Sequence, residues 1–300
     1  MLMYDYVASF CDEFQYPEEA KQTLLTGYHQ LSENKEVNRI YTEYIEQYRK
    51  GDLKDFNKAL ETLYSAAELC GVHKYTIALL FLIGLSKQLR KIYEDRGISY
   101  QIYYDSMCDL KWKLFECKKM HDVWGSFVAD WEAGFFRLEL FALGRLQFEI
   151  IKSSKSYEKD GHTIHVGDPV INVHIPSCGP LLHENCLESY RRAAVFFQDR
   201  FQEKPIPFVC NSWLLFPPNK EILSKDSHIV AFMKDYDIVS TSFYENGSDL
   251  WRVFYKERQK DPKELPRDTS LQRGYADWLM KGNKVGMGYG VFFLDGENCL

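Results

Sequence analysis

The sequence predicts an α+β protein, with an all-α helical N-terminal domain over residues 1–134 and a mixed α/β C-terminal domain over residues 135–300. Three observations support this prediction. The first 134 residues contain one proline, Pro17, and their apolar residues recur three and four positions apart, as in packed helices. From about Phe135 apolar and polar residues begin to alternate, which is typical of half-buried strands. Strand-like and helix-like segments then follow one another, which indicates a sheet with crossover helices.

The first half should contain about five or six helices that form an all-α bundle. Pro17 and the two glutamates after it mark one helix start, because proline fits the first turn and acids favour its positive end. The clearest apolar stripe lies between Asp52 and Gly71, where glycine marks a helix end. Further helices are expected at residues 35–48 and 73–95 and, after Ser99, through Trp112, Phe115, Trp124 and Trp131.

The stretch from Pro169 to Phe201 is the centre of the predicted second domain. Val170–Ile175 is rich in β-branched residues and lies between prolines, which predicts a short strand. Gly179 follows in a turn. A helix is then predicted from apolar residues at helical spacing, namely Leu187, Tyr190, Ala194, Phe197 and Phe201. A strand that turns through glycine into a helix directs unpaired backbone N–H groups at one spot, which favours phosphate binding. The alternative is that Gly179 only makes the turn.

Two further strands are expected beside this stretch. Residues 143–150 alternate between apolar and polar types, which would place Arg145, Gln147 and Glu149 on one face of a strand. Residues 208–216 form a nearly continuous apolar run between prolines, which predicts a buried strand. Because a helix separates it from the strand at 170–175, we expect these two strands to pair in parallel.

The C-terminal part completes the predicted sheet. Thr269 with Gln272 three residues later has the pattern of a capping box and predicts a helix start. Gly286, Gly288 and Gly290 share one face of the last strand, 285–293, so a neighbouring helix or a ligand should pack unusually close there. The other elements expected are a hairpin turn at 159–161, a strand at 163–166, a helix at 226–236, a strand at 237–243 and a helix at 250–255.

Charge and cysteine spacing exclude several classes of protein. The formal net charge is -6 and the basic residues are scattered, which argues against nucleic-acid binding. The eight cysteines form no C-x-x-C pair, so neither a metal site nor a redox motif is expected. The first residues are acidic without a basic start, and the longest apolar run, 77–85, is too short to span a membrane. We therefore expect a cytoplasmic protein without a metal.

Six blocks of sequence together carry a resemblance to a known family. They are Leu143–Glu149, His174–Leu181, Ser212–Leu215, Trp251–Phe254, Leu265–Arg273 and Gly286–Gly290. With these blocks in this order, the chain resembles the GNAT-like acyltransferases of gut Firmicutes and their relatives. In those proteins a helical N-terminal domain precedes a GNAT-like C-terminal domain of the N-acetyltransferase type. The resemblance covers nearly the whole chain and implies acyl-CoA, carrying an acetyl or a longer acyl group, as the co-substrate.

The resemblance also implies where acyl-CoA binds. In the wider superfamily the pyrophosphate lies on the loop between the fourth strand and the next helix, which corresponds to Pro176–His183, and the pantetheine arm lies between strands 170–175 and 208–216. The residues implied are Ile175, Pro176, Ser177, Cys178, Gly179, Leu181, Leu182, Asn211 and Ser212. The loop departs from the superfamily motif, because it has one glycine, Pro180 lacks an N–H group, and Glu184 brings negative charge to the helix start.

Acyl transfer from a thioester to an amine requires a base for the amine proton and a donor for the departing thiolate. His174 is the candidate base, because imidazole ordinarily titrates close to neutral pH. Glu149 is the second candidate, and Tyr244 or Tyr190 is the candidate acid. Each has a structural alternative: a hydrogen-bonded core histidine, a glutamate paired with an arginine, and tyrosines that only pack.

The function predicted from the sequence is transfer of an acyl group from acyl-CoA to an amine acceptor by direct attack, with both as small-molecule partners. The alternative is a non-catalytic binding or interaction protein with a degenerate GNAT fold, which Pro180 and Glu184 favour. A third hypothesis is a cysteine-dependent hydrolase or an acyl-enzyme on Cys178 or Cys186, which lie where a helix start favours a thiolate. Direct transfer ranks above it, because no histidine-acid pair for a cysteine is visible.

Overall fold

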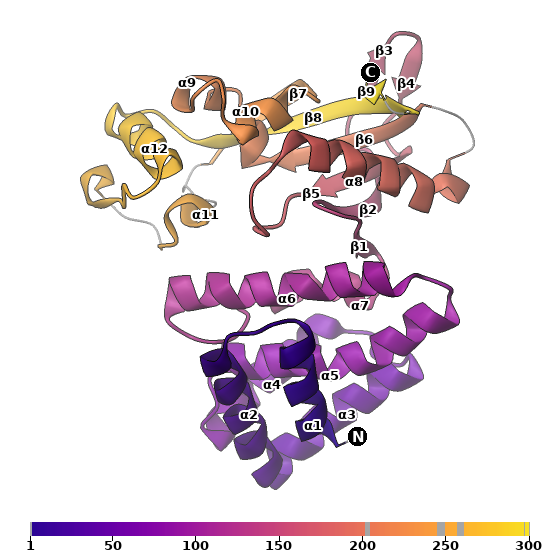
Figure 1. The fold of residues 1–300 in the computed structure, drawn as a ribbon, viewed down its shortest axis with the longest axis vertical. Coiled ribbons are helices and arrows are strands. Elements are labelled where there is room, and N and C mark those ends of the chain that lie inside the picture. Colours follow the sequence, from indigo (N-terminus) through magenta and orange to yellow (C-terminus); the bar gives the residue numbers. More distant parts are fainter. Residues whose placement is uncertain (1, 202–204, 245–249, 257–260, 297, 300) are drawn as a thin grey trace. The chain divides into compact units, whose positions relative to one another are not determined.

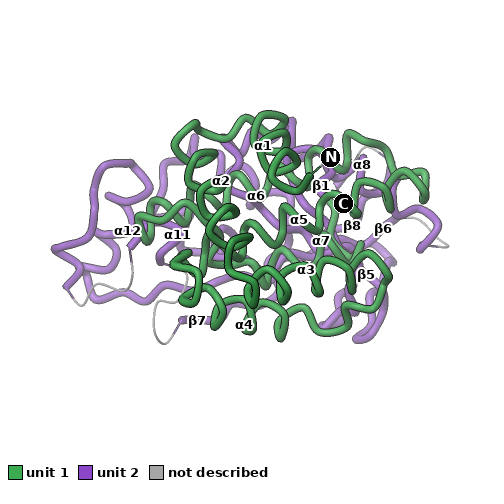
Figure 2. The backbone as a smooth tube through the Cα atoms, turned by 90° about the horizontal axis from the view of Figure 1, so that it is seen from below, with its two compact units in different colours: residues 1–141 green, residues 142–300 purple. Residues whose placement is uncertain are grey.

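The computed structural model describes residues 2–201, 205–244, 250–256, 261–296 and 298–299. The chain divides into two compact units, residues 1–141 and 142–300, which Figure 2 shows in separate colours. Helices form the first unit up to its last residues, and a mixed sheet with helices forms the second. The predicted α+β class is therefore confirmed.

The first unit is a helical bundle around one long helix, α5 (Lys74–Asp95), which contacts every other α-helix described in this unit (Figure 1). Residues 76–86 of α5 are all buried, so this helix is the centre of the bundle core. The side chains of Asn34, His73 and Ser99 accept hydrogen bonds from first-turn N–H groups and fix three helix starts. The other helices are α1 (Met3–Glu13), α2 (Glu18–Glu33), α3 (Lys35–Lys50), α4 (Phe56–Ala67), α6 (Tyr100–His121) and α7 (Ala129–Phe136).

The predicted long helix before residue 134 is two helices. α6 stops at Asp122, which has a φ of +57°, a left-handed conformation that ends the helix. The chain then crosses the start of α5, where the Ser126 N–H donates to the Tyr75 carbonyl oxygen at 2.9 Å. Trp124 therefore lies in a connection, and Trp131 belongs to α7.

The second unit is built on a mixed sheet with the strand order β1-β2-β5-β6-β8-β7, and β9 pairs with β8. As predicted, β5 and β6 are parallel, whereas β2–β5, β6–β8 and β7–β8 are antiparallel. β3 and β4 form a separate hairpin whose turn residues, Asp160 and Gly161, both have positive φ, as the sequence predicts. The strands are β1 (Leu140–Ala142), β2 (Gln147–Lys152), β3 (Tyr157–Lys159), β4 (His162–Ile164), β5 (Pro169–His174), β6 (Ile206–Ser212), β7 (Asp237–Phe243), β8 (Gly286–Asp295) and β9 (Asn298–Cys299).

One face of the sheet is covered by α8 (His183–Phe196), which follows β5 (Figure 1). Tyr190 of α8 is fully buried, and its ring centroid lies between 4.8 and 6.4 Å from those of Phe148, Phe208 and Phe292. We call the side of the sheet formed by these three phenylalanines the packed face. The remaining helices of this unit are α9 (Asn219–Ile222), α10 (His228–Met233), α11 (Trp251–Phe254) and α12 (Ser270–Met280).

The helices of the second unit confirm some expected details and change others. Thr269 and Gln272 form the predicted capping box at the start of α12. In α8, Tyr190 is buried as expected, but Leu187 and Ala194 are only half-buried. The buried positions of this helix are Cys186, Ser189, Tyr190 and Ala193. Over the described parts of the chain, no helix combines the length and the apolar character that crossing a membrane requires.

The alternating run at 143–150 contains a turn as well as a strand. Gly144 has a φ of +91°, and the turn that it forms delays the start of β2 to Gln147. The alternation predicted that Arg145 would share a strand face with Glu149. This prediction is wrong, because Arg145 lies in the turn.

The apolar run at 208–216 also contains two elements. β6 ends at Ser212, whose Oγ accepts a hydrogen bond from the Leu214 N–H at 3.2 Å and opens a 3-10 turn, η3 (Trp213–Leu215). Apolar composition does not distinguish a buried strand from a buried turn, which explains the longer strand that the sequence predicted.

The glycines of β8 let other segments approach the sheet closely, as predicted. A Cβ at Gly288 would lie 2.2 Å from the carbonyl oxygen of Leu215, and one at Gly290 would lie 2.8 Å from Cβ of Tyr236. The close neighbours are therefore η3 and the residue that precedes β7. The segments that approach these two glycines are a short 3-10 turn and a strand-flanking residue, and not the long neighbouring helix that is one of the two expectations.

Candidate functional site

The two parallel strands of the sheet separate at one end. β5 and β6 pair at Ile171 with Phe208 and at Asn172 with Val209, and among the described residues their pairing stops there. Beyond these positions β5 stays beside β2 up to His174, and β6 stays beside β8. The facing edges of β5 and β6 therefore diverge, and their backbone groups no longer bond to each other. We call this opening the splay.

The register places several polar side chains on one side of the sheet around the splay. Gln147 lies opposite His174, and Asn211 lies opposite Tyr289. His174 and Asn211 are each two residues beyond a paired position of β5 and β6, so they share a face and flank the splay. Glu149 lies opposite Asn172, which is on the same face of β5 as His174. We call this side, opposite the packed face, the polar face; its residues are Gln147, Glu149, Asn172, His174, Asn211 and Tyr289.

Glu149, Asn172 and His174 form one hydrogen-bonded group beside the splay. Nε2 of His174 lies 2.7 Å from Oε1 of Glu149, and Nδ2 of Asn172 lies 3.0 Å from the same oxygen. The side chains of His174 and Glu149 are 21% and 28% exposed, so solvent reaches both. With Glu149 ionised, Nε2–H of His174 donates to the carboxylate, and the imidazole lone pair lies on Nδ1. In this tautomer the histidine accepts a proton while the carboxylate orients it.

The loop after β5 is held in place by Arg145. Its guanidinium donates to the backbone carbonyl oxygens of Pro176 at 2.9 Å, Gly179 at 2.9 Å and Pro180 at 3.1 Å. The Arg145 N–H donates to Oγ of Ser189 in α8 at 2.8 Å, so the turn before β2 is tied to both the loop and the helix. Gly179 has a φ of +102°, and the space where its Cβ would lie is open. Arg145 thus binds the loop carbonyls and does not pair with Glu149.

The helix α8 begins directly after this loop without a capping side chain. Leu182 occupies the N-cap position and its side chain makes no hydrogen bond to the first turn, so the first N–H groups lack a capping acceptor. Nε2 of His183 lies 2.7 Å from Oδ1 of Asp235, and burial raises the pKa of this aspartate, although its bond to His183 acts in the opposite direction. Glu184 is exposed in the first turn. The helix start therefore offers N–H donors to an anion, with Glu184 as an opposing charge.

The other predicted site residues lie in three different places. Tyr244 follows β7 and packs against an apolar cluster that includes Val253 and Leu265, so the structure does not bring it to His174 and Glu149. Ser212 caps η3, and Asn211 is exposed on the polar face. The residues that lie with Gly179 in the segment after β5 are Ile175, Pro176, Ser177, Cys178, Leu181 and Leu182. The described residues contain no group of three or more His, Cys, Asp or Glu side chains suited to a metal ion.

Tyr190 and Cys186 are enclosed on the packed side of the sheet. The Tyr190 hydroxyl lies 3.1 Å from that of Tyr236, and burial raises the pKa of Tyr190 well above its ordinary value. Cys186 is fully buried, and this burial raises the pKa of its thiol to about 12. Cys178 is half-buried, with its Sγ 3.8 Å from the Arg145 carbonyl oxygen. Neither Tyr190 nor Cys186 therefore lies on the polar face.

The sequence does not single out two residues that the structure places at this site. Arg145 follows a glycine in a turn, which is a sign that the alternation around it is interrupted. Tyr289 separates Gly288 from Gly290, and strand alternation places its side chain on the face opposite to theirs. Its hydroxyl is buried and has no hydrogen-bond partner within the described parts of the chain.

Comparisons with known proteins agree with this geometry. Residues 5–138 match the model of the N-acyltransferase N-terminal domain, and residues 140–292 match that of the GNAT-like C-terminal domain. Among curated proteins, none matches the chain. One similar solved structure is an acyltransferase in complex with decanoyl-CoA and teicoplanin, with a TM-score of 0.73 and 22% identity over 96% of this chain and 87% of that chain. Another is an acyltransferase in complex with decanoyl-CoA, with a TM-score of 0.68 and 22% identity over 94% and 86% of the two chains.

The two family models cover nearly all of the chain, and the second alone spans about half of it. The solved structures share its fold across both units. Its own sheet has a parallel strand pair that splays beside a loop and a helix start, as the resemblance implies for this kind of domain. The chain belongs to the GNAT-like acyltransferases that combine an N-acyltransferase N-terminal domain with a GNAT-like C-terminal domain.

Proposed function

We propose that this protein transfers an acyl group from acyl-CoA to an amine acceptor by direct attack of the amine on the thioester. The observation that carries the proposal is the splay between β5 and β6, together with the loop that leads from the end of β5 to the uncapped start of α8. Unpaired strand edges offer hydrogen bonds to an amide-containing chain, and a helix start offers N–H groups to phosphates. A pantetheine arm and a pyrophosphate require these two kinds of partner in this order.

The acyl-CoA site follows from this placement. The pantetheine amides would pair with the free backbone edge of β5, and the pyrophosphate would lie against the N–H groups of the loop and of the first turn of α8. Arg145 supports such binding because it takes up the carbonyl oxygens of Pro176, Gly179 and Pro180, which would otherwise be available to repel phosphate. Asn211 lies on the β6 side of the splay.

The chemistry assigned to the polar face is proton removal. Nδ1 of His174 takes a proton from the attacking amine, and Glu149 stabilises the imidazolium that forms through its contact with Nε2 at 2.7 Å. Asn172 holds the carboxylate from the side through Nδ2. Because this base can remove the amine proton while the amine attacks the bound thioester directly, the protein requires no nucleophile of its own.

Direct transfer is favoured over an acyl-enzyme by the state of the cysteines. Cys186 is fully buried with a raised thiol pKa, so it does not supply a thiolate near neutral pH. Cys178 contacts the backbone of Arg145 in the loop, whereas the histidine-carboxylate pair lies on the polar face of β2 and β5.

The acyl chain and the acceptor can be approached through the similar structures. One of those acyltransferases binds decanoyl-CoA and teicoplanin. We infer that decanoyl-CoA should be tested as a donor beside acetyl-CoA, and teicoplanin as an acceptor beside simple amines.

The first experiment is a thermal-shift titration with CoA, acetyl-CoA and decanoyl-CoA, followed by assay of thiol release with a panel of amines. Binding to the folded state should raise the apparent stability by about 2.7 kcal/mol at a hundredfold excess over the dissociation constant. His174→Ala should keep this shift while thiol release falls about 100- to 10,000-fold. His165→Ala, an exposed histidine of the same domain, is the matched control and should keep both.

The alternative is a non-catalytic binding or interaction protein that keeps the GNAT fold without a working cofactor loop. Pro180 without an N–H group and the exposed Glu184 favour it, since both weaken the loop as a phosphate site. Absence of a thermal shift with all three ligands, from a folded sample, would contradict the acyl-CoA proposal. The same absence would favour the non-catalytic alternative, and a shift without thiol release for any amine would contradict the proposed transfer.

A further inference from the structure

Tyr289 is a buried tyrosine of the sheet whose hydroxyl lacks a hydrogen-bond partner; the hydroxyls of Tyr16 and Tyr93, which also lack one among the described residues, belong to the first unit. Tyr289 is 8% exposed and belongs to an apolar cluster on the polar-face side of the sheet with Val170, Val209 and Val291. Its hydroxyl is buried and has no hydrogen-bond partner in the parts of the chain that the structure describes. A buried hydroxyl without a partner lowers stability, because water has been removed and nothing replaces its hydrogen bond. Phenylalanine would fill the same space without this loss, so the hydroxyl requires another explanation.

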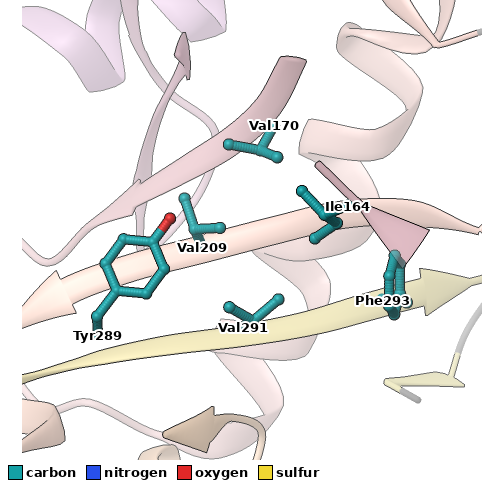
Figure 3. Packing of buried hydrophobic residues seen from close by; sticks show 6 residues of the cluster. All are labelled: Ile164, Val170, Val209, Tyr289, Val291 and Phe293. Atoms are coloured by element: carbon teal, nitrogen blue, oxygen red, sulfur yellow. The ribbon is translucent and has the colours of Figure 1, made fainter. Parts of the chain in front are cut away.

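The position of Tyr289 supplies that explanation. Tyr289 lies opposite Asn211 on β6, and Asn211 and His174 are each two residues beyond the paired Val209 and Asn172, so the three residues lie on the same face of β8, β6 and β5. Figure 3 shows the Tyr289 ring extending from β8 with its hydroxyl oxygen directed toward Val209 of β6. Val209 is the last residue of β6 that pairs with β5. The hydroxyl is therefore directed toward the place where the splay begins, on the face that bears His174.

We propose that Tyr289 donates a hydrogen bond to the thioester carbonyl oxygen of the bound acyl-CoA and holds that oxygen as it becomes negatively charged. This inference rests on the proposed function and names a residue that acts in it. As the amine nitrogen bonds to the carbonyl carbon, the π electron pair moves to the oxygen, and His174 takes the amine proton. The electron pair then returns, the C–S bond breaks, and CoA leaves as a thiolate.

Tyr289 keeps its proton throughout this sequence and acts only as a donor. A donor placed for the charged oxygen lowers the barrier more than it strengthens substrate binding. The missing partner of the Tyr289 hydroxyl is thus the substrate oxygen itself. The Tyr289 ring lies in a cluster with the apolar side chains of Val170, Val209 and Val291, and Nζ of Lys155 lies 5.8 Å from its centroid.

Isotope-edited infrared spectroscopy tests the contact without knowledge of the acceptor. Decanoyl-CoA labelled with ¹³C at the thioester carbonyl is bound to the full chain, and its carbonyl stretch is compared with that of the free ligand. A hydrogen bond from Tyr289 shifts the band to lower frequency in the parent, and Tyr289→Phe should lose that shift. Once an acceptor is known, turnover of this variant should fall about 100-fold or more, with the KM for acyl-CoA little changed.

A second tyrosine provides the matched control. Tyr275 is 2% exposed, and its hydroxyl donates to Oδ1 of Asn219 at 2.6 Å, so Tyr275→Phe leaves a buried acceptor without its donor. This variant should unfold at a lower urea concentration than the parent and keep the shifted carbonyl band. Tyr289→Phe should show the reverse: an unfolding midpoint equal to or above that of the parent, and a band at the frequency of the free ligand.

The outcomes separate this inference from the proposed function. A parent that does not bind decanoyl-CoA contradicts both. A parent that binds it with a shifted band that persists in Tyr289→Phe overturns the inference alone. A lower unfolding midpoint for Tyr289→Phe also overturns it, because the hydroxyl would then have a partner within the protein.

Discussion

The two faces of the C-terminal sheet use the same strands for different purposes. On the packed face, Phe208 and Phe292 are fully buried and stack with ring centroids 4.9 Å apart and planes 9° apart. On the polar face, His174 and Glu149 remain partly exposed, and Tyr289 holds a buried hydroxyl for which the described chain supplies no partner. Because side chains alternate along a strand, one residue step separates the two environments.

This difference teaches that stability and chemistry can be changed separately in this domain. A side chain removed from the packed face leaves a cavity that nothing can fill. Removal of a partly exposed side chain of the polar face, such as His174, leaves a space that solvent already reaches in part. Substitutions on the packed face should therefore mainly lower the free energy of unfolding, and substitutions of the partly exposed polar-face residues should mainly lower acyl transfer.

The largest effect is expected for Phe208→Ala on the packed face. Phe208 is fully buried between Phe292 and Tyr190, so its loss should lower the free energy of unfolding by about 3–5 kcal/mol. Urea denaturation followed by tryptophan fluorescence measures the change. A decrease below about 1 kcal/mol would show that the packed face is not the main source of stability in this domain.

A smaller loss is expected for Gly288→Ala, which adds an atom to the same face. The new Cβ would lie 2.2 Å from the carbonyl oxygen of Leu215, so η3 must move away from the sheet. Overpacking of this kind lowers the free energy of unfolding by about 1–3 kcal/mol. Met287→Ala, at the half-buried neighbouring position, is the control and should cost less. Equal losses for the two variants would contradict the close approach of η3.

Arg145→Ala should affect ligand binding more than folding. It removes three hydrogen bonds to the loop carbonyls, so the dissociation constant for CoA should rise roughly tenfold, which is about 1.4 kcal/mol. Isothermal titration calorimetry measures it. Arg145→Lys should recover only part of the affinity, because an ammonium group lacks the planar fork of guanidinium. The control is Arg39→Ala, which removes an exposed arginine of α3. An affinity for Arg145→Ala equal to that of the control would exclude a role for Arg145 in loop geometry.

The smallest change in stability is expected for His174→Ala on the polar face. Partly exposed ion pairs contribute between about 0 and 1 kcal/mol, so the urea midpoint should move little while acyl transfer is lost. If this variant loses as much stability as Phe208→Ala, the distinction between the two faces fails, and His174 is a core histidine rather than a base.

Much of the fold follows from interactions between residues that are close in sequence. The Thr269–Gln272 capping box and the Asp160-Gly161 turn depend on neighbours along the chain, and both predictions are confirmed. The parallel pairing of β5 with β6 is confirmed as well, since the intervening α8 requires a crossover. Strand ends were harder to predict, because Gly144 and Ser212 turn the chain inside runs whose composition still resembles a strand.

The candidate site was predictable only where the residue type itself suggests a role. His174 and Glu149 could be proposed from type and strand position, and the structure brings them within 2.7 Å; their roles stay predictions. The contacts of Arg145 lie 31 to 35 residues away, and no local pattern encodes them. The significance of Tyr289 depends on the register of three strands and on a missing partner, neither of which a sequence contains.

The arginine that fixes the loop from outside has a consequence for motif searches and for protein engineering. A loop proposed to hold pyrophosphate is ordinarily sought as a short glycine pattern, but residues 176–183 contain one glycine, and Arg145 determines much of their shape. A profile for this loop should therefore join Gly144-Arg145 to Gly179-Pro180, two dipeptides that no short window includes together. A designer who grafts the loop onto another scaffold must transfer Arg145 and its turn with it.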